Sequence, residues 1–439
     1  MRLFHCLIIL LLCFVNTAFS QAIDKEKLDA YLKTLEVHQK WMGSVALMKA
    51  GKILYQYSTG FNNYETRTLA DQNTTYRIGS ISKTITATLV LKAVEEKRLR
   101  LDDKLARYYP NILHADSISI RHLLSHRSGI HNYTDDSTYL QWHTKPHSEG
   151  EMLLIIQQGG SDFMPGTKTS YSNANYYLLA CILQRVYDQS YEKMLTNKIT
   201  KPIGLTNTFS GMPIQPDKND CYSYTFLEDW TKQPETHLSV ALGGGSVVST
   251  PTDLVRFADA LFSGKIISRQ SLNQMKTMQD GFGFGLFAVP FYEKQGFGHT
   301  GGIDGFSSVF YYFPEDGIAF AMTSNGSNYD DNTISIAALS AVYNKPFSIP
   351  VFNQNKPNAD LLEKYEGVYT SETIPLQIMI SKKGTNLYAQ GSGQPAIMLE
   401  YESEHRFSFA KANLVLVFNL ADNTMLLKQG GIEAVFKKQ

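Results

Sequence analysis

The spacing with the most chemical content is that of Ser80 and Lys83, which lie three positions apart at the start of an expected helix. Residues three apart on a helix have Cβ atoms about 5–6 Å apart, so the Lys83 amine can reach the Ser80 hydroxyl. A serine attacks a carbonyl only with a base beside it, and a lysine is a base only when unprotonated. The ordinary lysine pKa of about 10.4 must then be lowered, by desolvation or by nearby positive charge. The pair predicts an activated serine nucleophile.

This spacing alone does not identify a site, because it occurs twice more in the chain. Ser190 precedes Lys193 by three residues after a polar break, where a serine is expected to cap a helix. Ser408 and Lys411 lie in strand-like sequence, where residues three apart point to opposite faces. Ser80 could also be a helix cap. Other residues must therefore separate a catalytic role from a structural one.

A second group of polar residues, Tyr171, Ser172 and Asn173, directly precedes another expected helix. A phenol can relay a proton between a nucleophile and a leaving group, and an amide can bind a substrate carbonyl. Tyr109 and Asn111 have the same spacing in an expected turn, so this pattern alone is ambiguous as well.

A third group, His299 and Thr300 followed by Gly301 and Gly302, ends one strand-like run and leads into the next. Two glycines leave a bare strand edge, where the backbone of a substrate can approach closely. The structural alternative is a loose turn between two strands.

In this chain order the three groups resemble the motifs of the serine β-lactamase and penicillin-binding-protein superfamily, and in particular its class C-like branch. The resemblance covers about residues 25–345 and includes the stretches YRIG at 76–79, IRHLLSH at 120–126 and GGGS at 243–246. That branch contains D-alanyl-D-alanine carboxypeptidases, D-aminopeptidases and β-lactamase-like esterases.

The resemblance implies that Ser80 forms an acyl-enzyme while Lys83 and Tyr171 share proton transfer; it leaves open which of the two is the general base. The backbone N–H groups of Ser80 and Gly302 would form the oxyanion hole. Four further positions would bind the substrate: Asn173, His299, Thr300 and Gly301. The resemblance implies no cofactor and no metal ion.

One departure from the branch concerns the substrate. Class C β-lactamases have a lysine at the position of His299, and a lysine is a permanent cation that suits a substrate carboxylate. Histidine has a reference pKa of about 6.5 and is mostly neutral at pH 7. We therefore expect a hydrolase of D-amino-acid peptides, amides or small esters. A class C-like β-lactamase and a penicillin-binding or sensor protein without turnover are the alternatives.

The elements expected around these motifs form an α/β (α+β) domain. Helices are expected at 24–40, 82–97 and 331–343 and after Thr250, a hairpin at 43–59, and strands at 282–289, 294–299, 305–313 and 317–324. Strands at both ends of the domain and helices between them predict an antiparallel sheet, closed by distant segments, with a helical subdomain. Residues 346–358 read as a linker, and 359–439 as a small all-β, barrel-like domain.

The composition, with 41 basic and 41 acidic residues among 439, gives no reason to expect a nucleic-acid partner. Residues 1–20 have a basic start, an apolar run at 7–15 and small residues before Gln21, the pattern of a secretory signal peptide. The run is shorter than the roughly 20 residues that span a bilayer. The pattern predicts export to the periplasm or outside the cell, with a mature catalytic domain at 21–345.

The cysteines remaining after removal of the signal peptide, Cys181 and Cys221, could pair, although Cys181 lies in an apolar helical run typical of a buried free thiol. His143 and His147 flank Pro146 in polar sequence, which favours a solvated loop over a metal site. A small-molecule or peptide substrate is the expected partner, and the sequence leaves the oligomeric state open.

Overall fold

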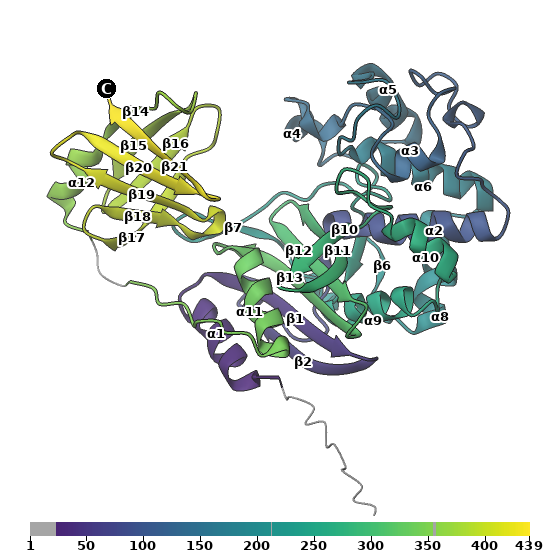
Figure 1. Cartoon of the computed structure of the whole chain (residues 1–439), viewed down its shortest axis with the longest axis horizontal. Coiled ribbons are helices and arrows are strands. Elements are labelled where there is room, and N and C mark those ends of the chain that lie inside the picture. The colour runs from purple at the N-terminus through teal and green to yellow at the C-terminus, as the bar shows by residue number, and fades with distance from the viewer. Residues whose placement is uncertain (1–22, 212, 354–356) are drawn as a thin grey trace, which may run out of the picture.

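The computed structural model describes residues 23–211, 213–353 and 357–439, with a six-stranded antiparallel sheet at the centre of the larger domain (Figure 1). Its order is β10-β11-β12-β13-β1-β2. The strands are β1 (Trp41–Lys49), β2 (Lys52–Thr59), β10 (Phe287–Phe291), β11 (Lys294–Ile303), β12 (Phe306–Phe313) and β13 (Ile318–Ser327). Because β1 pairs with β13, with Trp41 opposite Ser327, segments from both ends of the domain close the sheet, as predicted. The signal-peptide prediction at 1–20 lies outside the described residues.

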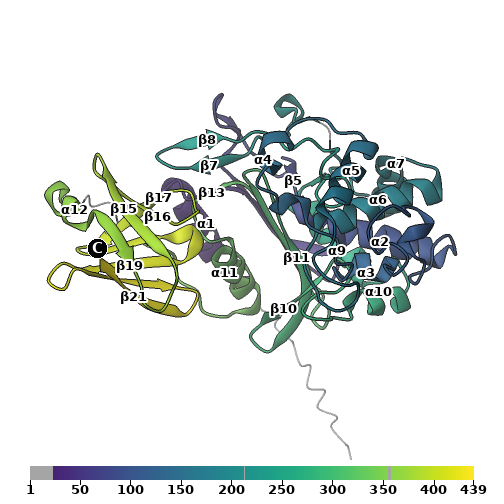
Figure 2. The same ribbon diagram turned by 90° about the horizontal axis from the view of Figure 1, so that it is seen from above.

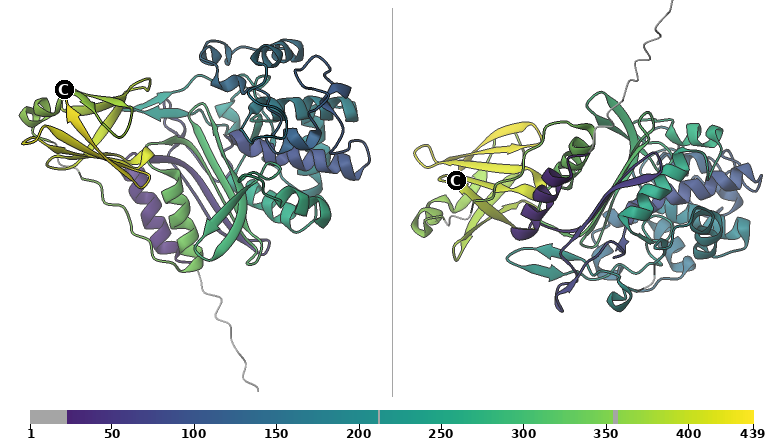
Figure 3. Two further views of the ribbon diagram at one scale, coloured as in Figure 1. Left: turned by 45° about the horizontal axis from the view of Figure 1, so that its top comes forward. Right: turned by 90° about the horizontal axis from the view of Figure 1, so that it is seen from below.

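One face of the sheet is covered by two helices, α1 (Lys25–Val37) and α11 (Asp331–Tyr343), which lie side by side (Figures 1 and 3). In α1 the apolar residues Leu28, Leu32 and Leu35 recur at three- and four-residue spacing and are fully buried. This spacing places them on the one stripe of the helix that faces the sheet. The expected helices at 24–40 and 331–343 are confirmed.

Helices on the opposite face separate the sheet from solvent and build the helical subdomain (Figure 2). Thr250 caps α9 (Pro251–Phe262), its hydroxyl accepting a hydrogen bond from the Asp253 N–H, as its sequence predicts. The central helix is α2 (Ser82–Glu95), which is buried on all sides over its first three turns. The others are α3 (Ile120–Leu124), α4 (Tyr139–Trp142), α5 (Glu149–Gly159), α6 (Asn173–Tyr187), α7 (Tyr191–Leu195), α8 (Lys201–Ile203) and α10 (Arg269–Lys276).

Short elements connect these helices to the sheet. The short strands are β3 (Phe61–Asn63), β4 (Thr68–Leu69), β5 (Tyr76–Arg77), β6 (Phe209–Ser210), β7 (Tyr224–Phe226), β8 (Trp230–Lys232) and β9 (Val247–Ser249). The helical turns of this domain are η1 (Gly79–Ile81), η2 (Leu105–Arg107), η3 (Tyr133–Asp135), η4 (Thr196–Thr200) and η5 (Pro216–Lys218). A further turn, η6 (Ala410–Ala412), lies in the C-terminal domain. Of these, η1 and η3 contribute to the candidate site.

The strand expected at 282–289 begins later than the sequence indicates, at Phe287. Gly285 has a φ of 63°, in the left-handed region, and its carbonyl accepts a hydrogen bond of 2.6 Å from the Thr84 hydroxyl. A Cβ at Gly285 would lie 2.7 Å from the Lys83 carbonyl oxygen. Residues 282–286 therefore cross closely over the start of α2, which prevents them from extending β10.

The C-terminal domain is a closed eight-stranded barrel, which confirms the predicted all-β fold. It is preceded by α12 (Ala359–Tyr365). Its strands are β14 (Gly367–Thr370), β15 (Gln377–Lys383), β16 (Asn386–Gly391), β17 (Ile397–Ser403), β18 (Arg406–Phe409), β19 (Leu414–Asn419), β20 (Thr424–Gln429) and β21 (Ile432–Lys438). Each strand pairs with the next, and β14 pairs with β21. The barrel contacts the larger domain through Lys40, 2.5 Å from Glu400, and through the Tyr388 hydroxyl, which donates to Glu228.

The two described cysteines, Cys181 in α6 and Cys221, are both buried free thiols. Among the described residues, no helix has the length and apolar character needed to cross a lipid bilayer.

Candidate active site

Ser80 lies in η1, the single helical turn that precedes α2. Gly79 permits this turn because its φ of 47° is in the left-handed region, and a Cβ there would lie 2.8 Å from the Gly302 nitrogen. The turn therefore packs directly against β11. Residue 81 is the N-cap of α2 and no side chain bonds the helix start, so the alternative role of Ser80 as a helix cap does not apply.

Lys83 is fully buried, and its Nζ has three polar neighbours. It lies 2.9 Å from Ser80 Oγ, 2.8 Å from Asn173 Oδ1 and 2.8 Å from the Gly244 carbonyl oxygen. None of the ion pairs found among the described residues involves Lys83. Desolvation by burial holds the pKa of this amine well below its ordinary value. The residue beside the serine is thus suited to be an uncharged base.

Tyr171 approaches the same serine from the loop that precedes α6. Its hydroxyl donates a hydrogen bond of 2.6 Å to Ser80 Oγ. Burial raises the pKa of the phenol above its ordinary value. Tyr171 is therefore protonated at neutral pH, as the donor of a relay must be. The hydroxyl of Ser80 lies between an amine and a phenol whose pKa values are shifted in opposite directions.

Asn173, the first residue of α6, has both ends of its amide occupied. Oδ1 accepts from Lys83, while Nδ2 donates to Asn132 Oδ1 at 3.2 Å and to Thr134 Oγ1 at 3.1 Å. In this arrangement Asn173 orients the Lys83 amine. Its predicted contact with substrate stays a prediction. Asn132 and Thr134 lie outside the three motifs, and no spacing in the sequence indicates them.

The third group of predicted residues, at 299–302, lies on β11. The first residue of β10, Phe287, lies opposite Gly298, so the residues of β11 after Gly298 pair only with β12. Thr300 is exposed and, with His299, lines a second cavity that β10, β11 and α11 form. Neither lines the cavity at Ser80, so their predicted roles in substrate binding stay predictions. Gly302, predicted with Ser80 to form the oxyanion hole, does line the cavity at Ser80.

His299 is buried against the Phe287 ring, with 4.3 Å between ring centroids. Desolvation, with a smaller contribution from Lys83, lowers the pKa of His299 to about 3. The imidazole is thus uncharged at neutral pH and gives no fixed positive charge at the position where class C β-lactamases have lysine.

We expect His299→Gln to make stability less dependent on pH. Between pH 6.5 and about 3 the unfolded chain binds a proton that native His299 does not bind, so stability falls as the pH falls through this window. A neutral glutamine removes that contribution. Urea unfolding at pH 4 and pH 7 measures it: the difference between the two free energies of unfolding should be smaller in the variant. An equal difference would show that His299 is not the group that titrates.

Gly301 fixes the distance between β11 and the Ser80 turn. A Cβ there would lie 2.1 Å from the Ile78 carbonyl oxygen and 2.5 Å from Ser308 Oγ. Ser308 Oγ also donates a hydrogen bond of 2.8 Å to that Ile78 oxygen. A side chain at residue 301 would therefore force β11 away from η1.

We expect Gly301→Ala to reduce kcat/KM about a hundredfold, because displacing reacting groups by about 1 Å costs that much. Steady-state hydrolysis of a chromogenic ester or amide measures the loss. Gly150→Ala is the matched control, since a Cβ at Gly150 meets only Ser148 Oγ at 4.0 Å. A Gly301→Ala enzyme as active as Gly150→Ala would contradict the role of this contact.

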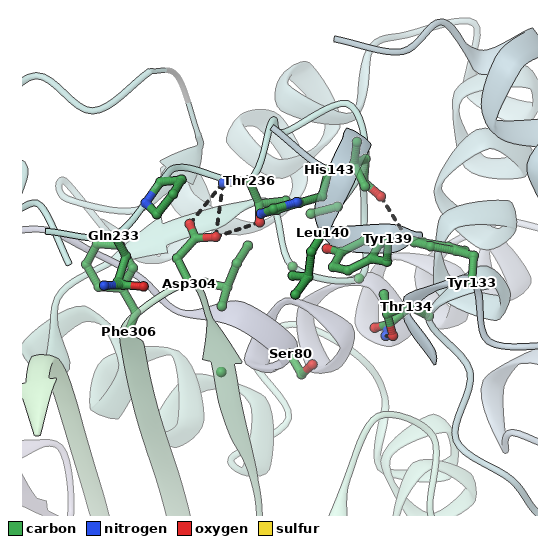
Figure 4. Close-up of a pocket in the computed structure, with 18 residues that line it drawn as sticks. Ser80, Tyr133, Thr134, Tyr139, Leu140, His143, Gln233, Thr236, Asp304 and Phe306 are labelled. Carbon is green, nitrogen blue, oxygen red and sulfur yellow. Dashed lines mark hydrogen bonds between the residues drawn. The ribbon is translucent and has the colours of Figure 1, made fainter. Parts of the chain in front are cut away.

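The cavity above Ser80 has a volume of about 650 Å³ and two walls (Figure 4). The first wall comes from η3, α4 and the residue after α4: Tyr133, Thr134, Tyr139, Leu140 and His143. The second comes from the segment after β8 and from the β11–β12 turn: Gln233, Thr236, Asp304 and Phe306. The three sequence motifs do not indicate any of these residues. His143, predicted to lie in a solvated loop, is half-buried in the turn after α4 and lines this cavity, with its Nδ1 buried.

Asp304 gives the second wall its charge. It accepts hydrogen bonds from the N–H and hydroxyl of Thr236 and lies 3.4 Å from Arg77. Arg77 also pairs with Glu235 at 3.1 Å, so two carboxylates share one guanidinium. No lysine or arginine is among the described residues that line this cavity. The balance of charge around it is therefore negative.

The fold and this site together define a serine hydrolase. Residues 33–343 match the family model described as Beta-lactamase, and the chain belongs to that family. Over 93% of its length it is 26% identical to penicillin-binding protein 4* of Bacillus subtilis, of which it covers 97%. It is also 24% identical to the teichoic acid D-alanine hydrolase of Staphylococcus aureus. That alignment covers 76% of this chain and 79% of the hydrolase.

A solved structure, the D-stereospecific amidohydrolase of a Streptomyces species, superimposes with a TM-score of 0.61 and 26% identity. It covers 72% of this chain and 98% of its own.

Proposed function

We propose that this serine hydrolase works through an acyl-enzyme on Ser80, with Lys83 as the general base of acylation. The observation that carries the proposal is the buried Lys83 amine, which lies 2.9 Å from Ser80 Oγ and forms no ion pair among the described residues. A neutral amine has two N–H bonds, and Asn173 Oδ1 and the Gly244 carbonyl accept them. The nitrogen lone pair is then left for the Ser80 hydroxyl, which donates to it.

In the proposed reaction the Ser80 proton passes to Lys83 as Oγ bonds to the substrate carbonyl carbon. The oxyanion forms beside the N–H groups of Ser80 and Gly302, and an oxyanion-hole donor is worth about 3–4 kcal/mol in comparable enzymes. The carbon–nitrogen or carbon–oxygen bond to the leaving group then breaks. The departing atom takes a proton from Tyr171, which Lys83 reprotonates. Water activated by the same pair releases the acyl group and restores Ser80.

We infer that the substrate is an amide, peptide or small ester of a D-amino acid whose amino group is free. The negative balance of Asp304, Glu235 and Arg77 favours an ammonium group near the second wall. A substrate carboxylate would find no lysine or arginine among the described residues that line the cavity. The similarity to a D-alanine hydrolase and to a D-stereospecific amidohydrolase supports this stereochemistry.

A substrate panel tests this specificity. We expect D-alanine p-nitroanilide to be hydrolysed at least tenfold faster, in kcat/KM, than its L-isomer or its N-acetyl derivative, since acetylation removes the charge. D-Ala-D-Ala peptides and nitrocefin, which carry a carboxylate, should be poorer substrates. Faster turnover of nitrocefin than of any D-amino-acid amide or ester would favour the β-lactamase alternative. Stable labelling of Ser80 by a fluorescent penicillin, without turnover of any substrate, would favour a penicillin-binding sensor.

We also propose that the protein is exported after removal of residues 1–20, on the pattern of the leader. Cell fractionation with amino-terminal sequencing tests this. A mature chain that begins at Gln21 in the exported fraction is expected, and an intact Met1 in the cytosolic fraction would contradict it.

A further inference from the structure

His126 lies outside the three motifs, in the turn after α3, yet it packs on the Tyr171 phenol. Its ring is stacked on the Tyr171 ring with 4.4 Å between centroids and 26° between planes. The side chain is buried, with 2% exposure. Its backbone has a φ of 56°, in the left-handed region that few non-glycine residues adopt. The backbone of His126 is thus held in an uncommon conformation at the residue whose ring contacts the Tyr171 phenol.

His126 also bonds the chain on both sides of Tyr171. Its carbonyl accepts a hydrogen bond of 2.9 Å from the Ser170 N–H, and its Nδ1 accepts one of 3.1 Å from the Ser172 N–H. Together with the ring contact, these bonds restrain the backbone before Tyr171, the backbone after it and one face of the phenol. No other residue described in this site contacts Tyr171 in all three ways.

The ring nitrogens have a defined protonation. Since Nδ1 accepts from the Ser172 N–H, the proton of a neutral imidazole is on Nε2. Burial, with smaller contributions from Lys83 and His299, holds the pKa of His126 well below its ordinary value, so the ring stays neutral. Asn175 Nδ2 lies 3.3 Å from the same Nδ1, and the Phe282 ring packs on His126 edge-on. His126 is therefore itself held in place from several sides.

We infer that His126 is a positioning residue, which holds the Tyr171 hydroxyl in line with Ser80 Oγ for proton transfer to the leaving group. The inference rests on the proposed function of Tyr171. His126 has no hydrogen bond to Ser80, so it acts through the tyrosine. The 2.6 Å bond between Tyr171 and Ser80 requires the phenol to point in one direction, and the stacked ring with its two flanking bonds supplies that direction.

Two substitutions separate the ring contact from the hydrogen bond. His126→Phe keeps an aromatic ring against Tyr171 but cannot accept from the Ser172 N–H, whereas His126→Gln can accept but cannot stack. We expect each to reduce kcat about thirtyfold while KM changes less than threefold, because the substrate cavity does not include His126. His122→Gln, in the preceding helix α3 and outside the cavity at Ser80, is the matched control and should keep its activity.

The decisive measurement repeats both substitutions in a Tyr171→Phe background, where no phenol hydroxyl remains to be positioned. We expect the thirtyfold effect of each to shrink below threefold there. An undiminished effect in that background, or a loss that appears only in KM, would overturn the inference. Circular dichroism establishes which variants are folded, and if His126→Phe unfolds, His126→Gln decides the outcome alone.

Failure of the proposed function can be told apart from failure of this inference. If the wild-type protein hydrolyses nothing in the panel, the rate of Ser80 labelling by a fluorophosphonate replaces kcat in the same comparison. Labelling slowed by His126→Gln in the Tyr171 protein, but not in Tyr171→Phe, would support the positioning role without any substrate. Equal slowing in both would reject it.

Discussion

Replacement of Ser80 by alanine is expected to reduce kcat by about a millionfold, the loss typical of removing the nucleophile from a serine hydrolase. The side chain left at residue 80 has no atom that can bond to a carbonyl carbon, while Lys83 and Tyr171 would have no hydroxyl to serve. Hydrolysis of D-alanine p-nitroanilide measures the loss. Intact-mass measurement after fluorophosphonate treatment should show one adduct on the wild-type protein and none on Ser80→Ala.

The chain supplies a matched control for this experiment in Ser190→Ala. Ser190 precedes Lys193 by the same spacing, but its side chain caps α7 by accepting from the Lys193 N–H. Loss of a cap costs about 1 kcal/mol of stability. We therefore expect Ser190→Ala to unfold more easily and to keep its activity and its adduct. An adduct retained by Ser80→Ala would place the nucleophile elsewhere and remove the basis of the proposed mechanism.

The contrast between these two serines shows which parts of the site a sequence can reveal. Ser80 and Lys83 meet because a helix brings residues three apart together, which is a local effect. Ser190 has the same spacing, but it is the extended N-cap of α7 and its hydroxyl accepts from the Lys193 N–H. Ser80 instead lies within a helical turn and is contacted by the Lys83 amine and the Tyr171 hydroxyl. The family resemblance predicted that Tyr171 lies beside Ser80, whereas the spacing of residues in a helix did not.

The fold was predictable where the patterns are long. The charged segment at 24–40 and the aromatic-rich runs at 305–313 and 317–324, separated by a turn, predict a helix and two strands, and the structure confirms them. The late start of β10 was not predictable, because it depends on the contact of Gly285 with α2, which lies far away in the sequence. Contacts between distant segments leave little trace in local composition.

The same reason explains the residues that the motifs missed. Asn132 and Thr134 hold Asn173, and His126 holds Tyr171, each from a loop whose sequence has no periodicity. The charge of the cavity is also a product of the fold, since Asp304 and Arg77 come from distant parts of the chain. The histidine at 299 was visible in the sequence, but its burial and its lowered pKa were not.

Replacement of Lys83 by methionine is expected to reduce kcat/KM by about 10²–10⁴-fold, the usual contribution of a general acid–base group. Methionine fills similar space without a nitrogen that can accept the Ser80 proton. Lys83→Arg separates a base from a mere positive charge, because an arginine stays protonated at all working pH values. We expect Lys83→Arg to be as inactive as Lys83→Met. Activity retained by Lys83→Arg, with a larger loss in Tyr171→Phe, would make the tyrosine the base.

Lys83 should also change how the free energy of unfolding depends on pH, an effect that can be measured without any substrate. Its pKa in the folded protein is well below the ordinary 10.5, so above that lowered pKa the unfolded chain binds a proton that the native chain lacks. The free energy of unfolding of the wild type therefore gains a contribution that rises with pH until about 10.5. In Lys83→Met this contribution disappears. Urea unfolding at pH 7 and pH 9 compares the two, and equal pH dependence would mean that the native amine is protonated and cannot be the base.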